Sequence, residues 1–170
     1  MKNTIKLIAL IAFAFMTMSA AAQVKLGHIE TQKLIQAMPE FIASQKTMEA
    51  EQASVEKELT SLGEQFQLKM GEYTKNMKTY SDIVRASKEQ ELQDLQKRVQ
   101  SFQEIAQNNL EKKNQELIQP IITKATEAIK AVGKENGFTY ILDMSAGGIL
   151  YAAESSQDIL PLVKKKLGMQ

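Results

Sequence analysis

The sequence predicts an α+β fold that is mostly α: a small β-body with three strands per protomer and a long antiparallel coiled-coil helical hairpin. Two stretches, 48–84 and 92–132, carry apolar residues at steps of three and four, which average to the coiled-coil period. Only residues 24–30 and 138–153 read as strands. The 170 residues include no cysteine, so stability must come from packing or oligomerisation rather than from disulfides.

The first 22 residues have the layout of a secretory signal peptide. Lys2 and Lys6 give a basic start, residues 7–16 are apolar, and residues 19–22 (Ser-Ala-Ala-Ala) offer a small-residue cleavage site. A membrane anchor is the alternative, but the apolar run is shorter than the roughly 20 residues that span a bilayer. We therefore expect an exported chain that begins at Gln23 after cleavage.

The predicted strands lie near the two ends of the exported chain. Residues 24–30 form one strand, and residues 138–144 and 149–153 form a hairpin around a turn at 145–148. Three short strands leave open edges and bury little apolar surface, which favours pairing between copies. The strand residues expected to drive assembly are Val24, Leu26, Phe138, Tyr140, Leu142, Ile149 and Tyr151.

Two long helices are expected between the strand segments. A short helix over 31–38 precedes Pro39, which fits the first turn of the next helix. The two seams are separated at 79–87, where Ser81 or Ser87 is a candidate N-cap. One uninterrupted helix is the alternative. A hairpin is favoured because each seam is a single stripe that needs a partner.

The second long helix is expected to kink at Pro120, where a backbone hydrogen bond is lost. Asn136-Gly137 then ends it, and a last helix follows over 159–167 with three lysines near its C-terminus. The predicted domains are the signal peptide at 1–22, the β-body and oligomerisation region at 23–43 and 119–170, and the helical hairpin at 44–118.

No set of residues indicates an enzyme. His28 is the single histidine and the chain has no cysteine, so we expect a hydrogen-bonded strand residue and no metal site. Asp143 has no partner acid at a useful spacing, and Gly147-Gly148 lacks the pattern of a nucleotide-binding loop. The net charge of +1 gives no sign of nucleic-acid binding. We expect no catalytic residue and no cofactor.

The order of these elements resembles the Skp/OmpH family of periplasmic chaperones. The resemblance covers residues 24–168 and rests on the strand VKLGHIE, the helical hairpin, and the C-terminal stretches ENGFTYILD, GGILYA and DIL. The C-terminal stretches are the more specific part, because any coiled coil has apolar seams.

The resemblance implies a trimeric "jellyfish" architecture with three hairpin tentacles. It also implies an ATP-independent holdase chaperone of the periplasm, which binds unfolded outer-membrane β-barrel proteins in the cavity between tentacles and prevents their aggregation. The expected partners are therefore unfolded outer-membrane proteins and further copies of the chain, with peripheral contact of the tips with the membrane as an added hypothesis. The alternative is a structural or adaptor coiled-coil protein of the envelope that binds a specific folded partner.

The charge of the hairpin departs from the strongly basic members of the family. Residues 44–118 hold 11 basic and 13 acidic side chains. The tip, residues 69–88, is the positive part at +3, and we call its cations the basic tip: Lys69, Lys75, Lys78, Arg85 and Lys88. Electrostatic capture of clients or lipids is therefore expected at the tip and not along the whole hairpin.

The tip also gathers Met, aromatic and β-branched side chains. Flexible, polarisable Met suits surfaces that accept many apolar partners. The candidates for client contact are Met70, Tyr73, Met77, Tyr80, Ile83 and Val84. Because most of them fall on seam positions, packing between the two helices is the plainer interpretation and client contact the functional one.

Overall fold

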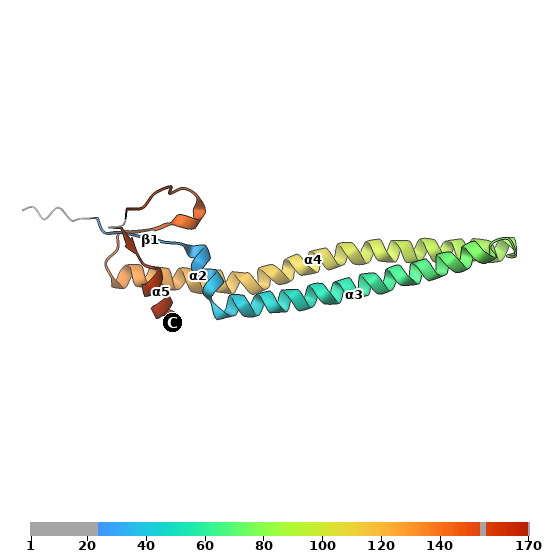
Figure 1. Ribbon diagram of the computed structural model, residues 1–170, viewed down its shortest axis with the longest axis horizontal. Helices are drawn as coiled ribbons and strands as arrows, with labels where there is room; N and C mark the ends of the chain where they lie inside the picture. Colours follow the sequence, from blue (N-terminus) through green and yellow to red (C-terminus); the bar gives the residue numbers. More distant parts are fainter. Residues whose placement is uncertain (1–23, 154–155, 170) are drawn as a thin grey trace, which may run out of the picture. The chain divides into compact units, whose positions relative to one another are not determined.

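The computed structural model describes residues 24–153 and 156–169 of the chain. The elements are β1 (Leu26–Ile29), α2 (Thr31–Ala37), α3 (Pro39–Asn76), α4 (Asp82–Glu135), β2 (Tyr140–Asp143), the 3₁₀ helix η1 (Met144–Ala146), β3 (Gln157–Asp158) and α5 (Leu160–Lys166). Helices α3 and α4 run side by side as an antiparallel hairpin (Figure 1). The mostly helical α+β fold with a three-stranded sheet is thus confirmed. The expected signal peptide lies outside the described residues.

The described chain forms two compact parts. The sheet part contains β1, β2, β3, α5 and the end of α4 from Ile129, and the hairpin part contains α2, α3 and α4 up to Ala128. The predicted boundaries between the β-body and the helical hairpin, at 43/44 and 118/119, stay a prediction, because they concern which residues assemble between copies.

Strand β1 is the centre of the sheet. The strand order is β2-β1-β3, and both neighbours run parallel to β1. The predicted antiparallel hairpin is therefore wrong: residues 149–153 form no strand, and the third strand is β3. Because β2 and β3 point the same way, the chain between them must return along the sheet, and this connection uses the residues predicted as a strand. Ile149 and Tyr151 thus lie in a connection and not in an assembly strand.

One face of the sheet is covered. A Cβ atom placed on Gly27 would lie 2.9 Å from the ring of Phe138 and 3.1 Å from Ile159, and Ile29 on the same face is only 1% exposed. Phe138, expected to drive assembly as a strand residue, precedes β2 and packs on this covered side. Glycine is required at position 27 because the ring occupies the space of a side chain.

The opposite face of the sheet is open. The register pairs Leu26 with Tyr140 and His28 with Leu142, so these side chains share the face away from Gly27. Tyr140 is 62% exposed, and Leu26 and Leu142 are also exposed. Assembly of copies through these strands, which the sequence predicts, requires such an uncovered apolar face.

The helix boundaries follow the predicted signals. Pro39 is the first residue of α3, and Ser81 directly precedes α4, where its hydroxyl accepts a hydrogen bond from the backbone N–H of Val84 at 3.4 Å. Ser87, the other candidate cap, lies inside α4. Helix α4 continues through Pro120.

Helix α4 ends in the glycine motif expected at Asn136-Gly137. Gly137 has a φ of +69°, and the N–H of Phe138 donates to the carbonyl of Gly133 at 2.9 Å. At the start of α5, the Asp158 carboxylate accepts from the N–H of Leu160 at 2.8 Å. No helix within residues 24–153 and 156–169 is long and apolar enough to cross a bilayer.

The core of the hairpin part follows the predicted seams. On α3, Leu62 is fully buried. The buried residues of α4 in this part all belong to the second seam: Leu92, Leu95, Ala106, Ile121, Ala125 and Ala128. The other seam positions of α3 are mostly half-buried, so one buried or half-buried line along each helix leaves the other sides of both helices in solvent.

Candidate functional site

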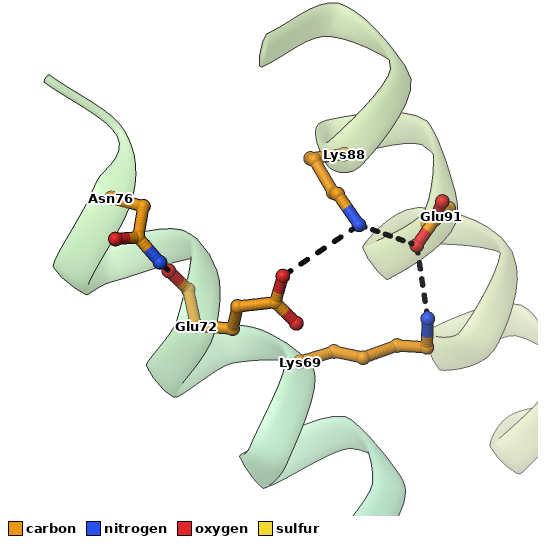
Figure 2. Close-up of polar contacts among 5 residues, drawn as sticks. All are labelled: Lys69, Glu72, Asn76, Lys88 and Glu91. Carbon is orange, nitrogen blue, oxygen red and sulfur yellow. Dashed lines mark hydrogen bonds and ion pairs between the residues drawn. The ribbon is translucent and has the colours of Figure 1, made fainter. Parts of the chain in front are cut away.

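A quartet of charges joins α3 and α4 near the tip of the hairpin (Figure 2). The Lys69 ammonium lies 2.9 Å from the Glu91 carboxylate, and the Lys88 ammonium lies 3.7 Å from Glu91 and 3.9 Å from Glu72. Each helix carries the pattern Lys-x-x-Glu, which places the two charges on one helix face. Because the helices are antiparallel, each lysine meets the glutamate of the other helix.

The quartet shifts the ionisation of its members. The hydrogen bond from Lys69, together with the charges of Lys69 and Lys88, lowers the pKa of Glu91 from its ordinary value. The same hydrogen bond raises the pKa of Lys69. All four side chains are solvent-accessible, so these pairs specify the register of the hairpin more than they stabilise it.

The two tyrosines of the tip form a contact between the end of α3 and the turn that follows it. The rings of Tyr73 and Tyr80 have centroids 6.3 Å apart at an angle of 41°. The Tyr73 hydroxyl donates to the Glu89 carboxylate at 2.5 Å, and this hydrogen bond raises the pKa of Tyr73. Both rings are half-buried.

The other client-contact candidates reach solvent. Ile83 is 84% exposed, and Met70, Met77 and Val84 are exposed to a smaller degree. The six candidates therefore divide into two tyrosines engaged within the hairpin and four apolar side chains available at its surface. Client contact at these four residues stays a prediction.

The basic tip is largely neutralised by neighbouring acids. Lys69 and Lys88 lie in the quartet, and the Arg85 guanidinium is 3.8 Å from the Asp82 carboxylate. In the described part of the chain, Lys75 and Lys78 have no carboxylate at ion-pair distance. Residues 69–91 hold five basic and four acidic side chains, so the predicted charge of +3 falls to +1 once the facing helix turn is included.

The sequence reasoning missed Glu89 and Glu91 as partners of the tip. They lie just outside residues 69–88 and reach Tyr73 and Lys69 because α4 turns back along α3. The repeated Lys-x-x-Glu pattern on the two sides of the turn was the signal that could have found them.

A groove in the middle of the hairpin was also missed. It has a volume of about 350 Å³ and lies between α3 and α4. Its apolar lining is Val55, Phe102, Ile105, Ala106 and Leu110, and its polar lining is Glu51, Asn109, Lys112, Lys113 and Glu116. Val55, Phe102, Ala106 and Leu110 are seam positions, so the sequence placed them correctly but did not show that the seam opens there.

A second groove of about 350 Å³ lies farther along the hairpin, beside Pro120. The Ser44 hydroxyl at its wall donates to the carbonyl of Phe41 at 2.7 Å. The Lys124 ammonium pairs with the Glu40 carboxylate, and this hydrogen bond lowers the pKa of Glu40. The polar groups of this groove are thus satisfied within the chain.

The remaining polar residues of the sheet part have structural contacts. His28 Nδ1 lies 2.8 Å from the hydroxyl of Ser156, which confirms a hydrogen-bonded strand residue. The Asp143 carboxylate accepts from the N–H of Ser145 at 2.8 Å, and Gly147 turns the chain with a φ of +72°. Across residues 24–153 and 156–169, no three His, Cys, Asp or Glu side chains form a group able to hold a metal ion.

A small parallel sheet followed by α5, together with a long helical hairpin, spans most of the described chain. The model of the family described as "Outer membrane protein (OmpH-like)" matches residues 25–167. The chain belongs to the OmpH-like family. A search of curated proteins gave no match. Membership of the OmpH-like family indicates, in general terms, a periplasmic chaperone of outer membrane proteins.

Proposed function

We propose that this OmpH-like protein is an ATP-independent holdase that binds unfolded outer-membrane β-barrel proteins and prevents their aggregation. The observation that carries the proposal is the set of apolar side chains left in solvent along the hairpin between charged residues: Leu68, Met70, Met77, Ile83, Val84 and Ile105. Five of these side chains lie at 68–84, and Ile105 lies in the middle of the hairpin. Flexible apolar side chains spread over a long surface can contact many unfolded sequences weakly, whereas a specific folded partner needs a large complementary patch.

We further propose that the protein is a homotrimer assembled through the sheet part. The open sheet face offers Leu26, Tyr140 and Leu142, with Val24 just before β1, and the connection after β2 offers Tyr151 and the 97% exposed Leu150. Burying these side chains between copies would supply apolar contacts that one copy lacks. Phe138 and Ile149 are half-buried within one chain and contribute less.

Three hairpins held by one assembly would enclose the cavity in which an unfolded client is held. Export through a cleaved signal peptide would bring the protein to the periplasm, where the clients pass. Peripheral contact of the hairpin tips with the membrane rests on Lys75 and Lys78, which are the basic-tip residues without a carboxylate partner among the described residues.

A structural or adaptor protein of the envelope is the second candidate function. The observation in its favour is the neutralised tip: the ion-pair quartet fixes the register of the hairpin, as a spacer that presents a defined surface requires. Such a protein would bind one folded partner and would show no preference for unfolded chains.

The test mixes the exported protein with several unrelated outer-membrane β-barrels diluted from denaturant, without ATP, and follows light scattering. A holdase suppresses aggregation of each barrel at stoichiometric excess and does not bind the same barrels after they have folded in detergent. Unchanged scattering with every barrel would contradict the holdase. Binding of one folded protein alone would favour the adaptor.

A further inference from the structure

The groove in the middle of the hairpin has an exposed apolar rim. Ile105 is 57% exposed, although its neighbour Ala106 is buried in the seam. Ala106 lies between the larger seam residues Phe102 and Leu110, and its small side chain leaves the space that the groove occupies. An apolar floor and an apolar rim that one hairpin leaves in water indicate a place where a further apolar side chain can be buried.

The size of the groove restricts what it can take. Its volume of about 350 Å³ is at the lower end of the range of about 300–1,000 Å³ for small-molecule sites. It is therefore suited to one or two side chains of a longer ligand. A folded protein partner would need about 800 Å² of complementary surface on each side, far more than this groove supplies.

The polar lining carries charges of both signs. Lys112 and Glu116 pair with each other at 3.9 Å. In the part of the chain that the structure describes, Glu51 and the half-buried Lys113 have no ion-pair partner. A carboxylate and an ammonium beside an apolar floor are complementary to a ligand that presents apolar side chains together with hydrogen-bond donors and acceptors.

We propose that this groove binds apolar side chains of an extended, unfolded strand in which apolar and polar residues alternate. The proposal rests on the holdase function and names one place on the hairpin where clients bind. Strands of membrane β-barrels alternate in this way, so apolar side chains recur on one side of the chain every two residues, about 6.6 Å apart. One such chain places apolar side chains on the floor, while its unpaired backbone N–H and C=O groups, at the sides of the strand, face Glu51 and Lys113.

The groove lies well away from the tip of the hairpin. Ile105 and Ile83 are 22 residues apart on α4, which corresponds to about 33 Å along the helix. At Ile83 the side chain is 84% exposed, outside both described grooves. A client side chain loses more water-exposed surface in the groove than on the helix at Ile83.

The test compares Ile105→Ser with the matched variant Ile83→Ser in the full exported protein. Both replace an exposed isoleucine of α4, and far-UV circular dichroism checks that each variant keeps its helices. The probe is a denatured outer-membrane β-barrel with a fluorescent label, titrated without ATP. We expect Ile105→Ser to weaken binding about 3- to 10-fold and Ile83→Ser to change it less than about 2-fold.

The possible results distinguish a failure of the groove proposal from a failure of the holdase proposal. If the unmodified protein does not bind the barrel at all, the proposed function is wrong. If it binds and Ile105→Ser binds equally well, or Ile83→Ser has the larger effect, the groove proposal is wrong and the holdase stands. A changed oligomeric mass in Ile105→Ser would identify a second copy as the occupant, and equal weakening for a folded barrel would identify a folded partner. Either result overturns the proposal.

Discussion

The sheet part and the hairpin part bury their apolar residues in different ways. In the sheet part, Gly27 packs against Phe138 and Ile159, which lie more than a hundred positions away, and Ile29 on the same face is buried. In the hairpin part, one buried line follows each helix and the adjoining positions remain partly in solvent. Single substitutions should therefore act on stability in the sheet part and on binding in the hairpin part.

The largest expected contrast is between two Ile→Ala substitutions. Ile29→Ala in β1 removes a side chain that is 1% exposed, so we expect a loss of about 2–5 kcal/mol in the free energy of unfolding. Ile105→Ala in α4 removes one that is largely in solvent, and we expect a change within about 0.5 kcal/mol. Chemical denaturation followed by circular dichroism measures both. Equal losses would show that the two parts do not differ as described.

A second pair of variants tests the close packing of the sheet part. Gly27→Ala would place a Cβ atom 2.9 Å from the Phe138 ring, so we expect a loss of about 1–3 kcal/mol in the free energy of unfolding. Gly63→Ala in α3 meets no described heavy atom within 4 Å and should stabilise the helix by up to about 1 kcal/mol. Thermal unfolding in the same buffer gives the sign of each change. Destabilisation by Gly63→Ala would mean that the hairpin is packed more tightly there.

The charge quartet predicts a smaller, pH-dependent effect confined to the hairpin. The pKa of Glu91 is lowered in the folded chain, so its ionised form contributes stability above the ordinary carboxyl pKa of 4.5. That contribution is lost as the pH falls below 4.5. Glu91→Gln should therefore lower the midpoint of thermal unfolding slightly at pH 7 and not at pH 3, and 1 M salt should shrink the difference. A difference that is the same at both pH values would contradict this origin.

The smallest expected effect concerns Lys75 and Lys78, the tip lysines that have no carboxylate at ion-pair distance among the described residues. The double substitution of Lys75 and Lys78 by Gln should reduce sedimentation of the protein with anionic lipid vesicles. The reason is that no carboxylate of the described residues lies at ion-pair distance from these two charges. Replacing Lys69 and Lys88 with Gln is the matched control and should reduce it less. Vesicles of neutral lipid should bind none of the variants. A larger loss in the control pair would place the lipid contact in the quartet.

Most of the fold followed from local signals in the sequence. Pro39, Ser81 and Gly137 act on the backbone within one helix turn, so their effect on helix ends was predictable. The seams were predictable because burial along a helix repeats with a short period.

The errors occurred where distant residues decide the structure. Residues 149–153 have a strand-forming composition, but both edges of β1 are taken by β2 and β3, and the parallel direction of β3 requires a return connection there. The neutralised tip was missed for the same reason, because Glu91 meets Lys69 only after the chain has turned back. The opening of the seam beside Ala106 depends on side-chain volumes on both helices, so the spacing of apolar residues along one helix does not predict it.

Native mass spectrometry of the exported protein, alone and after addition of one denatured outer-membrane β-barrel, shows directly whether several copies hold one client. We expect three copies in the free protein and three copies with one barrel in the complex. A free monomer, or a trimer that never carries an unfolded barrel, would contradict it.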